Sequence, residues 1–257
     1  MGVGSSQIVI YASSGMPIND TYRSGGDINS GIRVLFNDLN DSTTITTYST
    51  DVRDQNTLIV SGWNNAQSVI TESIAIDGTG RTVGSTTFSG LLCAKLSHAT
   101  GTGTIVVSGT DQNTVGRIPI RESGFQRPFY LATSSSSSSI TRYEKVFLKN
   151  NNTTSTLKYA KVLATGIGLG SILINYALEN GKSVNPSGIG VEESVANRLT
   201  APSNVGGYGS GVSGVWPSGT GNLEPTAYQG IWLRLTLDQD QLVNSARYNL
   251  RGSGYTS

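Results

Sequence analysis

The chain has 257 residues, of which 14% are charged, and a formal net charge of +1. This balance gives no broad basic surface for replacing the counterions of nucleic acid, and no run approaches the ~20 apolar residues of a membrane-spanning helix. The 32 glycines, with frequent Ser, Thr and Asn, favour turns and extended backbone over helix. We therefore predict an all-β protein without a nucleic-acid or membrane partner.

The first 27 residues are predicted to form an N-terminal arm. QIVIYAS (7–13) has the composition of a strand, and the polar segment 13–26 is expected to be extended. Such an arm becomes ordered against a neighbouring chain, and a frayed terminus is the alternative. Because the start lacks a charged region followed by a long apolar stretch, we expect no signal peptide.

Short segments of alternating polarity recur along the rest of the chain. In IWLRLTL (231–237) the aliphatic side chains fall on one face, and Trp232, Arg234 and Thr236 fall on the other. Many such strands separated by turn residues predict a sandwich or a barrel. Helices of a turn or two are expected only at 191–199 and 238–246. The same pattern is found at 57–63, 68–76, 86–96, 103–109, 156–164 and 171–178.

Two pairs of segments indicate an internal duplication. VLFNDLNDSTTI (34–45) aligns with VFLKNNNTTSTL (146–157), and FSGLLCAKL (88–96) resembles YQGIWLRLTL (228–237). This predicts two tandem β-sandwich domains, Ig-like or jelly-roll-like, behind the extended arm. Their expected bounds are 1–27 for the arm, 28–125 for the first domain, 126–140 for a Ser-rich linker and 141–257 for the second domain, with a Gly-rich loop at 201–222.

The residues that usually carry catalysis or bind metals are scarce. His98 is the only histidine and is expected in a surface turn, and Cys93 is the only cysteine, which rules out an intrachain disulfide and a usual zinc site. We predict no catalytic, cofactor-binding or metal site, and hence no enzyme. A carbohydrate-active enzyme stays open as an alternative, because folding could bring together two of the scattered carboxylates: Glu72, Glu122, Glu144, Glu179, Glu192, Glu193 and Glu224.

Aromatic and arginine side chains are the best candidates for an interface, because Trp, Tyr and Arg are enriched at binding hot spots. Trp232 and Arg234 are expected on the outer face of their strand, with packing beneath a loop of the same domain as the alternative for Trp232. Trp216, in the Gly-rich loop, is expected either to anchor a partner or to cover its own core. The predicted interface residues are Ile18, Tyr22, Arg23, Arg127, Tyr208, Trp216, Trp232 and Arg234.

Three segments resemble a module that recurs in structural proteins of tailed bacteriophages. They are the series from TLIVSGW to TIVVSG (57–109), YEKVFLKNNNTTSTLKYAKVLATG (143–166) and GIWLRLTLDQDQLVNSARYNLRGSG (230–254). The resemblance implies Ig-like or jelly-roll-like domains in a virion protein of the capsid decoration, or cement, type.

A protein of that type is made in the host cytoplasm and ends on the capsid surface. There it clamps neighbouring capsomers by binding the major capsid protein, often as a trimer, which makes a homo-oligomer the expected state. Tail, baseplate and head-fibre proteins share such modules, so a component involved in host adsorption is the alternative.

Overall fold

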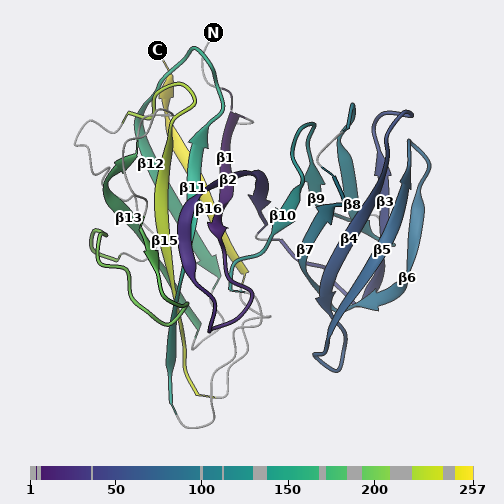
Figure 1. The fold of residues 1–257 in the computed structure, drawn as a ribbon, viewed down its shortest axis with the longest axis horizontal. Helices are drawn as coiled ribbons and strands as arrows, with labels where there is room; N and C mark the ends of the chain where they lie inside the picture. The colour runs from purple at the N-terminus through teal and green to yellow at the C-terminus, as the bar shows by residue number, and fades with distance from the viewer. Residues whose placement is uncertain are drawn as a thin grey trace. The chain divides into compact units, whose positions relative to one another are not determined.

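The described part of the protein consists of strands, turns and irregular segments. The computed structural model describes residues 4, 7–35, 37–98, 101–111, 113–129, 138–167, 172–183, 193–208, 222–239 and 247–256. None of these residues is α-helical, which confirms the all-β prediction (Figure 1). The strands are β1 Ile8–Gly15, β2 Ser24–Val34, β3 Thr43–Ser49, β4 Gln55–Trp63, β5 Val69–Asp77, β6 Thr82–Phe88, β7 Gly90–Leu96, β8 Ile105–Gly109, β9 Thr114–Ile118, β10 Gly124–Gln126, β11 Ile140–Asn150, β12 Leu157–Ile167, β13 Ile172–Ser183, β14 Ser194–Val195, β15 Tyr228–Leu237 and β16 Arg247–Thr256.

The helix expected at 191–199 is replaced, in its described part, by the short strand β14. Ser194 and Val195 of β14 pair with Gly25 and Ser24 of β2. The Glu193 carboxylate is used elsewhere, since it accepts hydrogen bonds from the backbone N–H groups of Ser203 and Asn204. The backbone groups that a helix would use for its hydrogen bonds are therefore engaged in sheet pairing. Most of the second expected helix, residues 240–246, lies outside the described residues.

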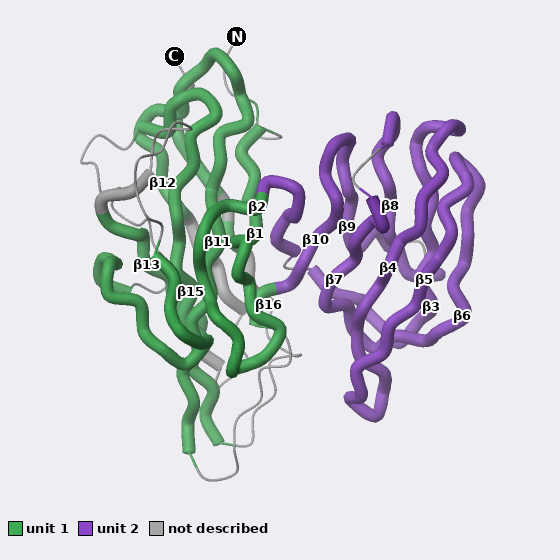
Figure 2. Tube along the Cα trace, in the orientation of Figure 1, with its two compact units in different colours: residues 1–29, 128–257 green, residues 30–127 purple. Residues whose placement is uncertain are grey.

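The chain divides into two compact units, and the division is not tandem. Unit 1 comprises residues 1–29 and 128–257, and unit 2 comprises residues 30–127 (Figure 2). Unit 2 is thus inserted between two segments of unit 1. The predicted tandem order is not confirmed, nor is the N-terminal arm, because β1 pairs along Ile8 to Ala12 with β11 of the same unit. The predicted linker lies partly outside the described residues, at 130–137.

Unit 2 contains two sheets that share one hydrophobic cluster. One sheet has the order β10-β7-β4-β5, with the end of β2 beside β10, and the other has the order β6-β3-β8-β9. Strand β5 shows how the sequence sets the faces, since Ile74 and Ile76 are buried in the cluster while Ser73 and Ala75 are exposed. Val107 and Ile118 contribute from the other sheet.

Unit 1 also contains two sheets. The larger has the order β13-β15-β11-β1-β2, with β14 on β2, and the smaller pairs β12 with β16. Ile231, Leu233, Leu235 and Leu237 of β15 are fully buried, and so is Trp232 on the opposite face. Strand β15 is therefore an internal strand, between β13 and β11, and its side chains are buried on both faces. This differs from the one exposed face expected from its alternation.

The duplication seen in the sequence corresponds to a repeated pairing scheme. In unit 2, β3 pairs antiparallel with β8 and β4 with β7. In unit 1, β12 pairs antiparallel with β16 and β13 with β15. The aligned segments occupy equivalent steps, because 34–45 and 146–157 each run from the end of one strand into the next. The segments 88–96 and 228–237 contain β7 and β15.

Each copy of the second motif places a glycine where a bulkier residue would collide. A Cβ atom on Gly90 would lie 1.9 Å from Cζ2 of Trp63. A Cβ atom on Gly230 would lie 2.5 Å from a carboxylate oxygen of Glu179. The glycine after the aromatic–polar pair thus makes room for an indole ring in unit 2 and for an acidic side chain in unit 1.

Candidate functional site

The middle of the large sheet in unit 1 brings together three of the predicted interface residues. Residues that pair across antiparallel strands share one face of the sheet. Strand β15 lies between β11 and β13 (Figure 1). Arg234 of β15 pairs in register with Tyr143 of β11 and with Asn175 of β13. Trp232, two residues earlier on the same face, lies beside Lys145 of β11. We call this the aromatic face and define it by Tyr143, Phe147, Tyr208, Trp232 and Arg234.

Tyr208 reaches this face from the segment that precedes the undescribed part of the Gly-rich loop. The segment follows strand β13, because Gly206 donates a backbone hydrogen bond of 3.0 Å to Leu178. The Arg234 guanidinium carbon lies 4.5 Å from the centre of the Tyr208 ring, which is a cation–π distance. The Tyr143 ring is tilted against Tyr208 at 6.0 Å. Burial raises the pKa of the Tyr208 hydroxyl, so the hydroxyl stays protonated.

A buried ion pair lies next to the aromatic face. Nζ of Lys145 lies 2.8 Å from Oε1 and 2.7 Å from Oε2 of Glu179, and neither side chain is accessible to solvent. The ammonium group also lies 4.9 Å from the centre of the Phe147 ring and 5.8 Å from that of Trp232. Glu179 additionally accepts a 3.0 Å hydrogen bond from the backbone N–H of Glu193. Both charges are therefore used within the fold.

A second ionic network joins three segments of unit 1, through Asp20, through Arg142 and Glu144 of β11, and through Arg198. Arg198 donates to Glu144 at 2.7 Å, and Arg142 donates to Asp20 at 2.6 and 2.7 Å. Asp20 bridges the two arginines, since it also lies 3.3 Å from Arg198. Burial raises the pKa of Glu144 despite the opposing effect of Arg198. At Asp20 the effect of partial burial is outweighed by Arg142 and Arg198, and the pKa is lowered.

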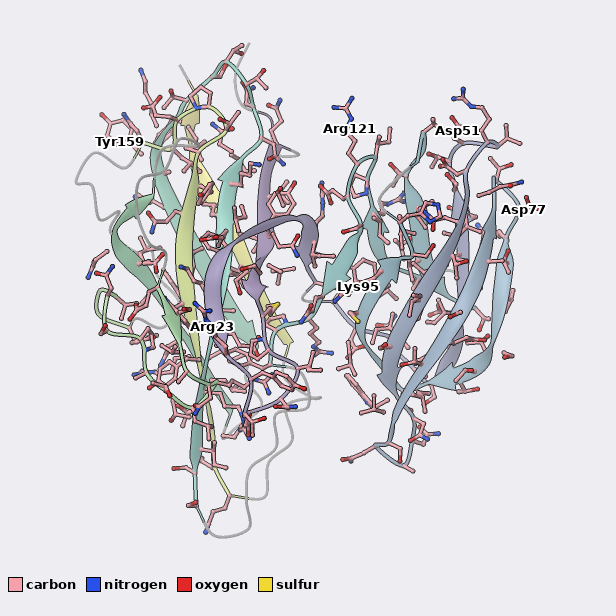
Figure 3. The ribbon with its side chains drawn as sticks, viewed as in Figure 1. Arg23, Asp51, Asp77, Lys95, Arg121 and Tyr159 are labelled. Carbon is pink, nitrogen blue, oxygen red and sulfur yellow. The ribbon has the colours of Figure 1, made fainter. Side chains whose placement is uncertain are left out.

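The other predicted interface residues are not gathered in one place. Ile18, Tyr22 and Arg23 follow β1 and are exposed. Arg23, labelled in Figure 3, donates a 2.9 Å hydrogen bond to Ser194. Arg127 is buried in unit 2, where it pairs with Asp38 and lies 5.7 Å from the Trp63 ring. Trp216 lies outside the described residues. The interface role of Ile18, Tyr22, Arg23 and Arg127 stays a prediction.

Trp232 does not present its indole at the surface. The side chain is fully buried, and a Cβ atom on Gly25 of β2 would lie 2.8 Å from Cη2 of Trp232. This supports the alternative in which Trp232 packs beneath a segment of its own unit. The positive φ of 102° at Gly25 is a conformation that favours glycine and allows this close approach.

An exposed pair of tyrosines was not anticipated from the sequence. Tyr159 of β12, labelled in Figure 3, is 64% exposed, and Tyr255 of β16 is 72% exposed. Their rings meet edge to face at 6.2 Å. A register shift between Lys158 and Lys161, with Tyr159 at a φ of 51°, turns the Tyr159 side chain outward. The alternation of TLKYAKVLA gave no signal for this shift, because it predicts Tyr159 on the same face as Leu157.

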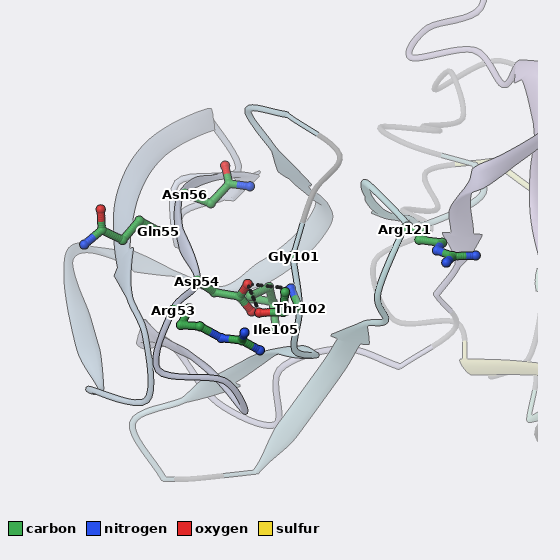
Figure 4. A pocket seen from close by; sticks show the side chains of 8 residues that line it. All are labelled: Arg53, Asp54, Gln55, Asn56, Gly101, Thr102, Ile105 and Arg121. Carbon is green, nitrogen blue, oxygen red and sulfur yellow. Dashed lines mark hydrogen bonds between the residues drawn. The ribbon is translucent and has the colours of Figure 1, made fainter.

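Unit 2 has a cavity of about 520 Å³ beside the turn that precedes β4. Asp54, Thr102 and the two arginines Arg53 and Arg121 are among its lining residues (Figure 4). The Asp54 carboxylate accepts hydrogen bonds from Thr102 N at 2.7 Å and Gly103 N at 2.9 Å, and it also bonds Ser49. The carboxylate thus ties the loop before β8 to the turn between β3 and β4.

Replacing Asp54 by alanine is expected to lower the free energy of unfolding of unit 2 by about 3 kcal/mol, because it removes charge-assisted hydrogen bonds and leaves two backbone donors unpaired. Burial alone would raise the pKa of Asp54, but the hydrogen bonds from Ser49, Thr102 and Gly103 outweigh it, and the pKa lies below its ordinary value of 3.8. A lowered folded-state pKa contributes stability above that ordinary value, and the contribution is lost as the pH falls through the folded-state pKa.

Urea denaturation across the acidic range tests this prediction. The difference between the wild-type protein and Asp54→Ala should be full at neutral pH and shrink below the ordinary pKa of Asp54. Asp77→Ala, at an exposed carboxylate of the same unit, serves as the control. Equal stability of Asp54→Ala and the wild-type protein at neutral pH would contradict the structural role of this carboxylate.

The described residues show no cluster suited to metal binding. No group of three or more His, Cys, Asp or Glu side chains converges within the described ranges. His98 is exposed, and its Nδ1 lies 2.9 Å from Oγ of Ser97. Within the same ranges, no helix is long and apolar enough to cross a membrane.

Comparison of the chain with protein-family models, with curated proteins and with solved structures gives no match.

Sequence reasoning therefore found part of the aromatic face and missed the rest. It identified Tyr208, Trp232 and Arg234 from residue type. It did not anticipate that Tyr143 and Asn175 flank Arg234. The clearest missed signal is the charge density of RYEK (142–145) within an apolar strand, because buried charges in a strand require partners.

Proposed function

We propose that the protein is a structural component of a tailed-bacteriophage particle that binds the capsid surface and stabilises the shell by clamping neighbouring capsomers. The observation that carries the proposal is the repeated pairing scheme, β3 with β8 and β4 with β7, then β12 with β16 and β13 with β15. It falls on the segments that resemble the phage module. Each unit is proposed to be a β-sandwich of the Ig-like or jelly-roll-like kind.

The partners of the glutamates favour a structural role over a glycosidase. Of the seven glutamates considered for catalysis, Glu192 lies outside the described residues, and each of the other six is held by groups of its own unit. The partners are Ser85 for Glu72, Arg33 for Glu122, Arg198 for Glu144, Lys145 for Glu179, Ser203 for Glu193 and Thr156 for Glu224.

The proposed partner is the major capsid protein, and the proposed state of the clamp is a homo-oligomer, with a trimer favoured. Clamping depends on contact area and shape, and a partner that binds only the assembled shell stabilises it by mass action. The exposed pair Tyr159 and Tyr255 is proposed as one contact, because tyrosine is enriched at interface cores and two exposed rings offer apolar area with a polar rim.

Binding to decoration-free particles of the parent phage tests the proposal. The purified protein is expected to sediment with such particles and to raise the temperature at which they release DNA. The double variant Tyr159→Ser, Tyr255→Ser should bind at least about tenfold more weakly. Val52→Ser, at an apolar side chain that is 73% exposed in unit 2, should bind like the wild-type protein.

The two results have different consequences. Failure of the wild-type protein to bind particles would overturn the proposed function. Normal binding by the double variant would overturn only the tyrosine contact.

A further inference from the structure

Arg234 is a partly buried cation for which the described residues supply no ion-pair partner. The Arg234 guanidinium stacks on Tyr208, but its Nε atom is buried and has no hydrogen-bond partner. No described carboxylate forms an ion pair with Arg234, whereas the nearby Lys145 is paired with Glu179. Because a buried N–H group is stable only when it is bonded, the buried Nε–H of Arg234 indicates a missing acceptor.

Three further polar atoms on this side of the sheet are also buried without a partner. They are Oη of Tyr208, Nε1 of Trp232 and Oδ1 of Asn175. The indole N–H can only donate, and the protonated Tyr208 hydroxyl can donate as well. Asn175 lies directly across from Arg234 in the sheet. Its unpartnered atom is the acceptor Oδ1, and a 180° flip of the amide places the Nδ2 donor there instead. The group therefore holds donors on Arg234, Tyr208 and Trp232, and no described carboxylate forms an ion pair with its one cation.

We propose that the aromatic face is a binding site for a carboxylate group, which Arg234 holds by charge-assisted hydrogen bonds with help from Tyr208, Asn175 and Trp232. Guanidinium groups match the planar, two-oxygen geometry of a carboxylate. A single unpaired cation fits a singly charged carboxylate better than a doubly charged phosphate. The Tyr208 ring stacks on the Arg234 guanidinium at 4.5 Å and so lies against the site.

The carboxylate has two sources that share this chemistry. It can be an acidic side chain of a partner protein, in which case the inference rests on the proposed function, or it can be a free organic acid. Acetate represents the free acid, and a hexaglutamate peptide represents the side chain. Capsid binding is measured separately, so failure of the site and failure of the proposed function are distinguishable.

The test is a titration of the full chain, labelled with ¹⁵N, with each probe at constant ionic strength. We expect saturable shifts of the Trp232 Nε1–H and Arg234 Nε–H signals. Arg234→Gln should weaken binding by about tenfold or more, and Tyr208→Phe, which removes only a hydroxyl, should weaken it less. Arg81→Gln is the matched control, since Arg81 stacks on Tyr48 at 4.9 Å in unit 2.

Each outcome decides the inference. Saturable shifts with acetate support a free acid, and saturable shifts with hexaglutamate alone support a partner side chain. Absence of saturable shifts with both probes would overturn the site and would indicate that water bonds the polar atoms of the cluster. Equal binding by Arg234→Gln and the wild-type protein would overturn the site as well. Should Arg234→Gln fail to fold, equal binding by Tyr208→Phe and the wild-type protein would overturn the site instead.

Discussion

Replacing Arg198 by methionine is expected to lower the free energy of unfolding of unit 1 by about 3–5 kcal/mol, because it leaves a buried carboxylate without its cation. Arg198 and Glu144 are both inaccessible to solvent, and their closest nitrogen and oxygen atoms lie 2.5 Å apart. Methionine keeps much of the apolar volume of the arginine stem, so the loss reflects the charge more than the packing. Urea denaturation, with hydrogen exchange to assign the transition to unit 1, measures the change.

The pH dependence of this variant has a defined sign. Burial already raises the pKa of Glu144 above its ordinary value of 4.5, and loss of Arg198 raises it further. A carboxyl with a raised folded-state pKa contributes stability at low pH, and the contribution is lost as the pH rises through the folded-state pKa. The defect of Arg198→Met should therefore be smaller at about pH 4 than at about pH 7.

Two controls separate the buried pair from ordinary charge effects. Arg53→Met removes an ion pair to Asp51 in which Arg53 is 73% exposed, and it should cost far less than Arg198→Met because solvent screens the pair. The double variant Arg198→Met, Glu144→Gln should recover part of the loss, because it no longer buries an unpaired charge. If Arg198→Met were as stable as Arg53→Met, the network would not stabilise the fold as described.

The second large effect is expected from Gly90→Ala, which should destabilise unit 2 by about 3 kcal/mol. The new methyl group would meet the indole of Trp63, which is itself buried on the paired strand. The backbone of two paired strands cannot separate without breaking sheet hydrogen bonds, so the indole has to move. A shift in Trp63 fluorescence should accompany the lower urea midpoint.

Gly207→Ala is the matched control, because its Cβ atom would have no heavy atom within 4 Å. It should change the free energy of unfolding by less than about 0.5 kcal/mol. If Gly90→Ala also stayed within that range, the repeated glycine would not serve the close packing that both copies of the motif show.

The fold class could be predicted because it depends on local patterns. Alternation at 57–63 and 68–76, bounded by turn residues, led directly to β4 and β5. The duplication was readable for the same reason, since each copy keeps an apolar strand end, a polar turn and a glycine after an aromatic residue. These features act between neighbours in the sequence.

The arrangement of the units could not be predicted because it depends on long-range pairing. The sequence of Ile8–Gly15 contains no signal that its partner strand is Ile140–Asn150. Sequence patterns alone therefore predict an arm for this segment. The aromatic face was only partly predicted for the same reason. Tyr143, Asn175 and Arg234 become neighbours only through the register of three strands, and Arg127 pairs with Asp38 at a sequence separation of 89 residues.

The most direct test of the proposed role is cryo-electron microscopy of decoration-free particles mixed with the full chain. The proposal predicts added density on the outer capsid lattice, at a position where one copy or one oligomer contacts neighbouring capsomers. Density confined to the tail or to a single vertex would contradict it and would favour the adsorption component instead. Particles without any added density would contradict a virion role on the capsid and on the tail alike.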